Sequence, residues 1–198
     1  MFLTFVTFLP IFGGLFLAFL PKENEGAIKQ TALAFAVADF LLSFLLWTNF
    51  DNSSHRMQFE YNISWIESWG INYHIGIDGI SLLLYVMTTF LTMICIIASW
   101  EVKKHIREYM MAMLALSTGM LGVFISLDLF MFYVFWEFQL VPMYIIVGVW
   151  GGPRRIYASI KFFLFTAVGS LLMLVAILWI YFHIQETTGV ATADIIYI

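Results

Sequence analysis

Residues 110–150 read MMAMLALSTGMLGVFISLDLFMFYVFWEFQLVPMYIIVGVW, an apolar run whose charged residues are Asp128 and Glu137 alone. As one helix this run would be about 60 Å long, whereas the hydrocarbon core of a bilayer is about 30 Å thick. The run therefore predicts two membrane-spanning helices that form a hairpin. We expect the break at Ser126, Leu127 and Asp128, because an aspartate at that position can cap the second helix.

The rest of the chain has the same character. Hydrophobic residues make up 62% of the 198 residues and charged residues 11%, whereas a soluble domain carries roughly 25% charged residues. A soluble core could not hide this much apolar surface, so the composition predicts an all-α integral membrane protein. The net charge of −4 is small and says little about partners, but the lack of a basic patch argues against binding of nucleic acid.

Apolar segments long enough to cross a bilayer predict about six transmembrane helices in one membrane domain that spans residues 1–198. The amino-terminal segment lacks the positive region and the cleavage site of a signal peptide, so we interpret it as the first helix. The sequence shows no internal repeat and no soluble domain. The expected helices cover residues 2–20, 28–47, 80–100, 110–125, 129–150 and 160–182.

Lysine and arginine predict the orientation of these helices, because cytoplasmic links are enriched in both residues. Arg56 is the single basic residue on the other side of the predicted membrane, which puts both ends of the chain outside the cytoplasm. The remaining eight of the nine basic residues follow the first, third and fifth helices: Lys22, Lys29, Lys103, Lys104, Arg107, Arg154, Arg155 and Lys161.

One external link has the pattern of β-structure. Apolar and polar residues alternate from Gln58 to Trp65 and again from Ile71 to Asp78, and a period of two is typical of half-buried strands. With Gly70 near the turn, we expect a small β-hairpin on the outer membrane surface. The alternative is an irregular loop whose aromatic side chains anchor it at the interface.

The sequence contains no motif of a soluble enzyme: no GxGxxG, GxxxxGK[ST], HExxH or CxxC. The single cysteine, Cys95, lies in an apolar run and is interpreted as a small buried hydrophobe. His55, His74, His105 and His183 lie in links or at helix ends without ligand spacing, so neither a metal nor haem is expected in this chain.

Charge inside the membrane is the remaining candidate for chemistry, because an ionisable group there is costly. Glu137 lies about 12 Å from the outer end of its helix by helical rise. Tyr133 and Tyr144 share its helical face and could hydrogen-bond its carboxyl or an ordered water. Pro142 removes the hydrogen bond to the Phe138 carbonyl and should bend the helix there. Glu137 is thus the candidate proton carrier; the alternative is a structural acid that a neighbouring helix satisfies.

Two further charged residues lie within the predicted helices. Asp39 is in the second helix, one turn before Ser43, and a structural hydrogen bond to another helix is the favoured interpretation. Lys161 is near the cytoplasmic start of the sixth helix, some 10–15 Å from the height of Glu137, so we expect no direct ion pair between them. A lysine at that depth can extend to the interface, which is the alternative to a supporting role.

The residues around Glu137 resemble a known family. The run from Asp128 to Gly152, DLFMFYVFWEFQLVPMYIIVGVWGG, is similar to the fifth helix of the subunit M family of bacterial NADH-quinone oxidoreductase, respiratory complex I, and of its mitochondrial counterpart, subunit 4. Three further segments agree in order and spacing, and together they extend the resemblance over nearly the whole chain: Gly76–Leu82, Ser99–Glu101 and Lys161–Phe163.

The resemblance implies an antiporter-like subunit of about fourteen helices, with inverted five-helix repeats at helices four to eight and nine to thirteen. The glutamate that matches Glu137 pairs in the family with a lysine on the seventh helix, which this chain lacks, so we expect a fragment of a longer sequence. NADH, FMN, iron–sulfur clusters and quinone are expected in other subunits. The implied partners are the other membrane-arm subunits and lipid, and the implied location is the bacterial inner membrane.

Three functions follow from these observations. The first is proton translocation coupled to electron transfer from NADH to quinone in other subunits, with Glu137 as the proton carrier. The second is that of a stand-alone multisubunit cation/proton antiporter, in which the same acid couples proton and sodium flow. The third is a purely structural membrane component, which predicts that Glu137 packs against lipid or apolar helices.

Overall fold

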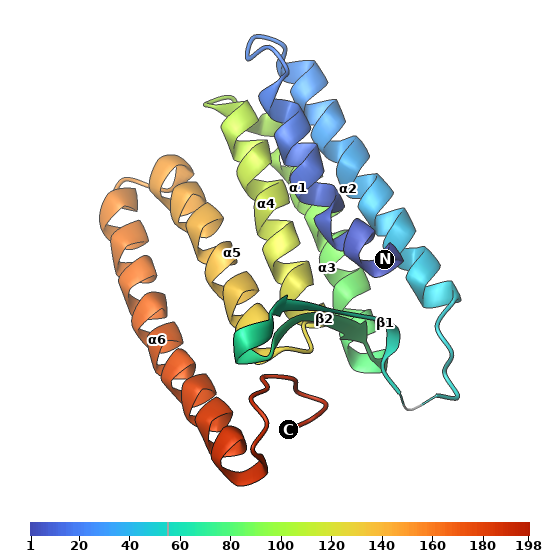
Figure 1. Cartoon of the computed structure of the whole chain (residues 1–198). Helices are drawn as coiled ribbons and strands as arrows, with labels where there is room; N and C mark the ends of the chain where they lie inside the picture. Colours follow the sequence, from blue (N-terminus) through green and yellow to red (C-terminus); the bar gives the residue numbers. More distant parts are fainter. Residues whose placement is uncertain (55) are drawn as a thin grey trace.

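The computed structural model describes residues 1–54 and 56–198, so His55 lies outside the described residues. Within them the chain forms six α-helices, and a β-hairpin stands between the second and the third (Figure 1). The helices are α1 Phe2–Ala18, α2 Glu25–Thr48, α3 Gly79–Ala98, α4 Ile106–Ile125, α5 Leu129–Trp150 and α6 Arg155–Thr188; the strands are β1 Gln58–Ile66 and β2 Ile71–Ile77; and two short 3-10 turns are η1 Glu67–Trp69 and η2 Ser99–Glu101.

The prediction of a helical membrane protein is confirmed. The helices α2 to α6 are each long and apolar enough to cross a membrane, whereas α1, at 17 residues, is shorter and equally apolar. A helix of that length is at the lower limit for a membrane span. The predicted break between α4 and α5 is confirmed, and the bounds of α5 are the predicted ones.

The sixth helix is longer than predicted. It begins at Arg155 rather than Ile160, and it continues past Phe182 through polar residues to Thr188. Gly189 ends it in the left-handed region, at φ 75°, where glycine carries no steric penalty. Its 34 residues correspond to about 51 Å, so the helix extends beyond the hydrocarbon core. The polar residues from His183 onward therefore continue the helix outside the hydrocarbon.

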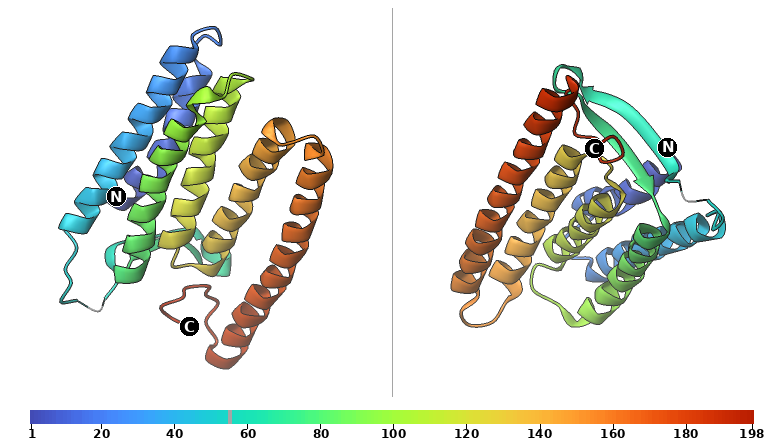
Figure 2. Two further views of the ribbon diagram at one scale, coloured as in Figure 1. Left: turned by 180° about the vertical axis from the view of Figure 1, so that it is seen from behind. Right: turned by 90° about the horizontal axis from the view of Figure 1, so that it is seen from below.

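Helices α1 to α4 pack together as a bundle, α5 lies against α4, and α6 lies against α5 at the edge of the molecule (Figures 1 and 2). The core has two clusters of buried side chains. One joins the bundle to the hairpin through Leu3, Leu46, Ile75, Ile77, Tyr85, Leu121 and Phe135; the other, at the opposite end, contains Leu17, Ile28, Ala32, Ile96, Met110 and Leu114.

The hairpin is confirmed as an antiparallel pair of strands, and it lies across one end of the bundle. Its burial differs from the prediction of one solvated face. In β2 the side chains of Ile71, Ile75 and Ile77 are buried, but His74 and Gly76 of the other face are buried too. Ile75 and Ile77 pack into the core of the bundle, whereas on the other face Leu127 lies against Gly76 and Asp194 contacts His74.

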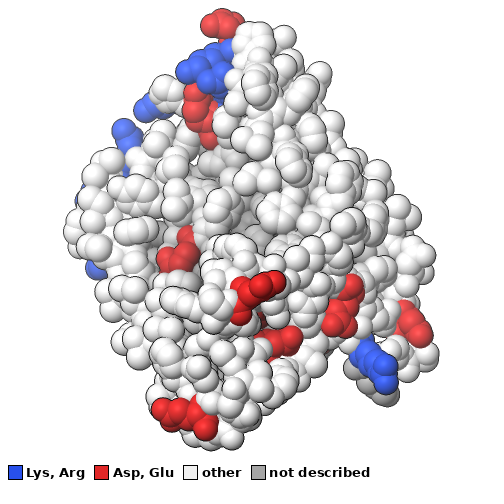
Figure 3. All heavy atoms as spheres, in the orientation of Figure 1, with Lys and Arg blue, Asp and Glu red and all other residues white. Residues whose placement is uncertain are grey.

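Both ends of the chain lie at the hairpin end. Thr4 of α1 accepts a hydrogen bond from Tyr73 of β2 at 3.3 Å, and Asp194 contacts His74 of the same strand. On the face drawn in Figure 3, basic side chains gather at the end of the bundle opposite the hairpin, and basic atoms also lie near the hairpin end. The six alternating helices therefore bring most of the basic residues to one end of the molecule, as their positions in the links predicted.

Two of these basic side chains also bind the ends of helices. Lys29 donates from Nζ to the carbonyl of Trp100 at 2.8 Å, where η2 continues α3. Arg107 donates from Nη1 to the carbonyl of Ala18, the last residue of α1, at 3.3 Å and to that of Leu20 at 3.2 Å. Carbonyls at helix carboxyl ends lack backbone donors, so these cations satisfy groups that hydrocarbon could not.

The turn of the hairpin generates a stability prediction. Gly70 has φ 59°, and a Cβ atom there would collide with the carbonyl oxygen of Ala191. We expect Gly70→Ala to destabilise the protein by about 1–3 kcal/mol, because the left-handed backbone and the close approach both penalise a side chain. Thermal unfolding in detergent, followed by tryptophan fluorescence, measures the effect. Gly152→Ala is the matched control, since no atom lies within 4 Å of its added Cβ; equal melting temperatures for the two variants would contradict the prediction.

Candidate functional site

The link that starts α5 is fixed by one carboxylate. Asp128 accepts hydrogen bonds from the backbone N–H groups of Phe130 and Met131 at 2.9 and 3.1 Å, which confirms the predicted cap. Its second oxygen accepts from the N–H of Asn72 in β2 at 3.1 Å. Burial raises the pKa of the Asp128 carboxyl above its ordinary value, and the three N–H groups oppose that shift. The cap therefore ties the first turn of α5 to the hairpin.

Glu137 lies more than two turns after this cap, about 12 Å along α5 by helical rise. Its side chain is partly buried, and its Oε1 atom is buried without a hydrogen-bond partner among the described residues. Tyr133, one turn earlier, brings its hydroxyl near the Glu137 carboxyl and near Ser170 of α6. The structure thus places a carboxyl, a phenol and a hydroxyl together between two apolar helices.

The other predicted companions of Glu137 lie apart from it. Tyr144 packs its ring edge-to-face against Phe163 of α6, with the ring centroids 5.5 Å apart. Pro142 is buried inside α5, which continues through it. Because proline has no N–H, the Phe138 carbonyl lacks its helical donor there. A bend of α5 near Phe138 remains a prediction.

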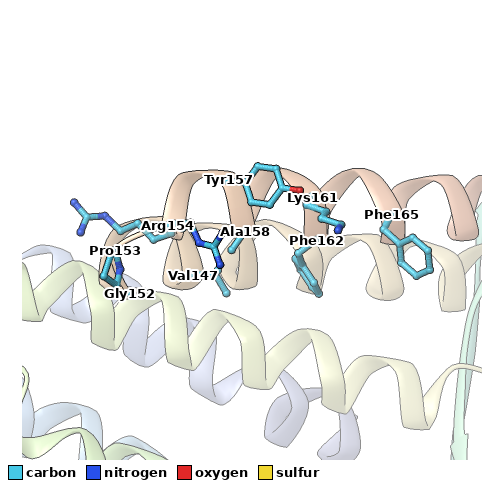
Figure 4. Close-up of a pocket in the computed structure, with 11 residues that line it drawn as sticks. Val147, Gly152, Pro153, Arg154, Tyr157, Ala158, Lys161, Phe162 and Phe165 are labelled. Atoms are coloured by element: carbon cyan, nitrogen blue, oxygen red, sulfur yellow. The ribbon is translucent and has the colours of Figure 1, made fainter.

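Lys161 does not reach Glu137. Its Nζ atom lies 5.8 Å from the centre of the Tyr157 ring, one turn earlier on the exposed side of α6, and no salt bridge to Glu137 occurs in the described part of the chain. Figure 4 shows both side chains on α6 beside a groove of about 820 Å³, which Gly152, Arg154, Phe162 and Phe165 also line. The expected absence of a direct ion pair agrees with this geometry, and so does a lysine that extends toward the interface.

Asp39 departs from its favoured interpretation. Its side chain is 1% exposed, yet its Oδ1 atom has no hydrogen-bond partner in residues 1–54 and 56–198. The bond between helices is made one turn later, where the hydroxyl of Ser43 meets that of Thr89 in α3 at 2.8 Å. The prediction that Asp39 forms a structural hydrogen bond is therefore wrong for Oδ1. The shorter side chain of Ser43 makes the hydrogen bond between α2 and α3 instead.

Sequence reasoning missed the role of His74, which it assigned to the polar face of a strand. The imidazole is 2% exposed and lies between two carboxylates. Its Nε2 atom is 2.8 Å from Oε1 of Glu60 in β1, and its Nδ1 atom is 2.9 Å from Oδ2 of Asp194 near the end of the chain. The imidazole therefore links β1 to the last residues of the chain through its two ring nitrogens.

The last residues of the chain extend this junction. Ala193 accepts a hydrogen bond from the N–H of Leu129, and Ile195 donates one to the carbonyl of Leu127, at 2.9 and 2.8 Å. The carbonyl of His74 accepts from the N–H of Leu127 on the other side at 2.9 Å. The irregular link before α5 is therefore bonded on both sides, which fixes where α5 starts.

Comparison with known proteins agrees with this architecture. Residues 126–195, from the link through α5 and α6, match the family model described as NADH:quinone oxidoreductase/Mrp antiporter, transmembrane. The match begins at the break between α4 and α5 and includes Glu137.

Individual relatives extend the similarity over the whole chain. NADH-quinone oxidoreductase subunit M of Rhodobacter capsulatus is 43% identical over 96% of this chain, and NADH-ubiquinone oxidoreductase chain 4 of Marchantia polymorpha is 43% identical over 90%. The chain spans 37% of the length of each. In a structure of respiratory complex I from Thermus thermophilus with bound NADH, one chain matches 98% of this chain with a TM-score of 0.81 and 26% identity, and this chain covers 38% of it.

The His74 junction generates a second prediction. His74→Ala leaves the carboxylates of Glu60 and Asp194 without their donor and opens a cavity, so we expect a loss of about 2–4 kcal/mol in stability. The melting temperature in detergent and protease sensitivity after residue 190 report the change. His183→Ala is the control, since that histidine is exposed and stacks on Trp179. A His74 variant as stable as the His183 variant would show that the junction contributes little.

Proposed function

We propose that this chain forms the amino-terminal part of a proton-translocating membrane-arm subunit of NADH-quinone oxidoreductase, with Glu137 as an intramembrane proton carrier. The observation that carries the proposal is the Glu137 carboxyl within an apolar helix long enough to cross a membrane, with a buried oxygen that lacks a partner among the described residues and with the Tyr133 hydroxyl near it. A carboxyl in such surroundings is costly as a fixed charge and useful as a group that takes up and releases a proton.

Electron transfer belongs to other subunits in this proposal. NADH, FMN, iron–sulfur clusters and quinone would bind there, and the partners of this chain would be lipid and the other membrane-arm subunits. A conformational or electrostatic change that follows quinone reduction would alter the counter-charge near Glu137 and so shift its affinity for a proton. The location would be the bacterial inner membrane.

The matching family is described by two activities, so a cation/proton antiporter subunit is the alternative. The relatives named as NADH-quinone oxidoreductase subunits, at 43% identity, favour the first activity. Sodium dependence discriminates between them: an antiporter subunit would give proton flux that requires sodium, whereas the proposed subunit would give flux that requires NADH and quinone. A purely structural role would leave proton pumping intact in an assembled Glu137→Gln complex.

The proposal predicts the effect of removing the carboxylic acid in the full-length parent protein. Glu137→Gln and Glu137→Ala should lower NADH-driven proton uptake by roughly tenfold or more, since neither can carry the proton, and Glu137→Asp should retain part of it. If pumping and electron flow are tightly coupled, quinone reduction should fall in parallel. Proton uptake and quinone reductase activity in membrane vesicles measure both.

Assembly is checked on native gels, and Glu101→Gln is the control because that acid is exposed beyond α3. Glu137 should be dispensable for assembly, so the loss of activity appears in an assembled complex. Full pumping by an assembled Glu137→Gln complex would show that Glu137 has a structural role.

The proposed orientation puts both chain ends outside the cytoplasm, and cysteine accessibility tests it. With Cys95 replaced by serine, single cysteines at Asn52 and Arg154 should react with a membrane-impermeant maleimide from opposite sides. Both positions are exposed; Asn52 lies in the link between α2 and the hairpin, and Arg154 lies in the link between α5 and α6. In right-side-out vesicles Asn52→Cys should react and Arg154→Cys should not; reaction of both from the same side would overturn the topology.

A further inference from the structure

Buried polar side chains run through the interior of the α1–α4 bundle, apart from Glu137. Each of them is at most 6% exposed, although the surrounding helices are apolar. All four helices contribute, and α3 contributes at positions 85, 89 and 92, which lie on one helical face. We refer to the set as the polar seam: Thr7, Asp39, Ser43, Tyr85, Thr89, Thr92 and Ser117.

The hydroxyl groups of the polar seam are hydrogen-bonded in pairs across helix boundaries. Tyr85 of α3 meets Thr7 of α1 at 2.9 Å, and Thr89 meets Ser43 of α2 at 2.8 Å. Thr92 donates to Ser117 of α4 at 3.1 Å. These pairs satisfy the hydroxyls without any charged group, so they account for every member of the seam except Asp39.

Asp39 is the residue of the polar seam that carries a carboxyl group, and none of these hydroxyl pairs includes it. It lies one turn before Ser43 on the same face of α2, and its Oδ1 atom has no partner among the described residues. Lys29 of the same helix is about 15 Å away by helical rise and is engaged with Trp100 and Glu25.

The surroundings determine the protonation state of Asp39. The residue is about 13 Å from the nearer end of α2, too deep for its short side chain to reach interfacial water. A carboxylate buried at that depth without a cation costs several kcal/mol, whereas a neutral carboxylic acid needs only a hydrogen-bond acceptor or a water. The hydroxyls of Ser43, Thr89 and Thr92 are groups that a water molecule could bridge to Oδ1.

We propose that Asp39 is a second proton-binding site within the membrane, held as a neutral carboxylic acid whose proton exchanges through water along the polar seam. The ligand is the proton, and the hydroxyl pairs supply the polar path. This site is separate from Glu137 and does not depend on the role assigned to that residue. The competing occupant is a sodium ion, which would require Asp39 to be ionised and would take carboxylate and hydroxyl oxygens as ligands.

Infrared spectroscopy of the full-length protein in membranes tests the protonation state. The carbonyl stretch of a protonated carboxyl, which shifts in D₂O, should lose one component in Asp39→Asn at neutral pH. Glu137→Gln should retain that component, so the outcome is independent of the proposed function. An Asp39→Asn spectrum identical to wild type in this region would show that Asp39 is ionised and would overturn the proposal.

A measurement on the unmodified protein covers the case in which Asp39→Asn fails to fold. Dicyclohexylcarbodiimide modifies protonated carboxyls in apolar surroundings, so mass spectrometry should find its adduct on the peptide that contains Asp39. Sodium should leave the yield unchanged. No adduct, or an adduct that sodium suppresses, would overturn the proposal, and suppression would identify a cation site instead.

A third experiment tests whether the proton of Asp39 exchanges along the polar seam. Thr92→Val keeps the shape of the side chain but removes the hydroxyl that pairs with Ser117, so deuterium exchange of the Asp39 carboxyl should slow several-fold. Thr88→Val is the matched control, since that threonine is on the same helix and bonds only the Leu84 carbonyl of its own backbone. Equal exchange rates in the two variants would refute the path along the seam.

Discussion

Hydrocarbon offers no hydrogen bonds, and this constraint accounts for most of what lies outside the helices. The chain must turn back between α4 and α5, and there the backbone leaves helical geometry. Asp128 binds the first N–H groups of α5, while β2 on one side and the last residues of the chain on the other bind the link. The hairpin and the final segment thus act as the hydrogen-bond partners that water supplies in a soluble protein.

The same constraint explains how much the sequence could predict. Helix number, the break at Asp128 and the hairpin all follow from local patterns: apolar length, a capping residue and a period of two. His74 was assigned to a solvated face because alternation describes only one strand. Its partners, Glu60 and Asp194, come from other segments, the second of them far along the chain. The extension of α6 also had no local signal, since hydropathy marks the bilayer and not the end of a helix.

The sequence identified the charged residues within the apolar helices, but it predicted only part of what surrounds each of them. Glu137 stood out because one acid interrupts a long apolar helix, and Tyr133 followed from its spacing of four residues. Tyr144 shares that face of α5, but its ring packs against Phe163 because α6 lies beside α5 there. For Asp39 the nearby serine suggested a hydrogen bond between helices. The bond exists, but Ser43 makes it, and only the packing of α2 against α3 reveals this.

Two acids in one membrane domain need not serve one purpose, and their burial separates them. Asp39 is enclosed by α1 to α4, so its charge cannot be balanced without rearranging a packed bundle, and its neutral form is favoured. Glu137 is partly exposed on α5, beside Tyr133 and Ser170, where a further helix or subunit could bring a cation to it. An enclosed acid favours a fixed protonation state with slow exchange, whereas an acid at an open helix face can respond to a moving charge. In our two proposals, the same cost of desolvation therefore favours a stable proton-binding site at Asp39 and a switchable one at Glu137.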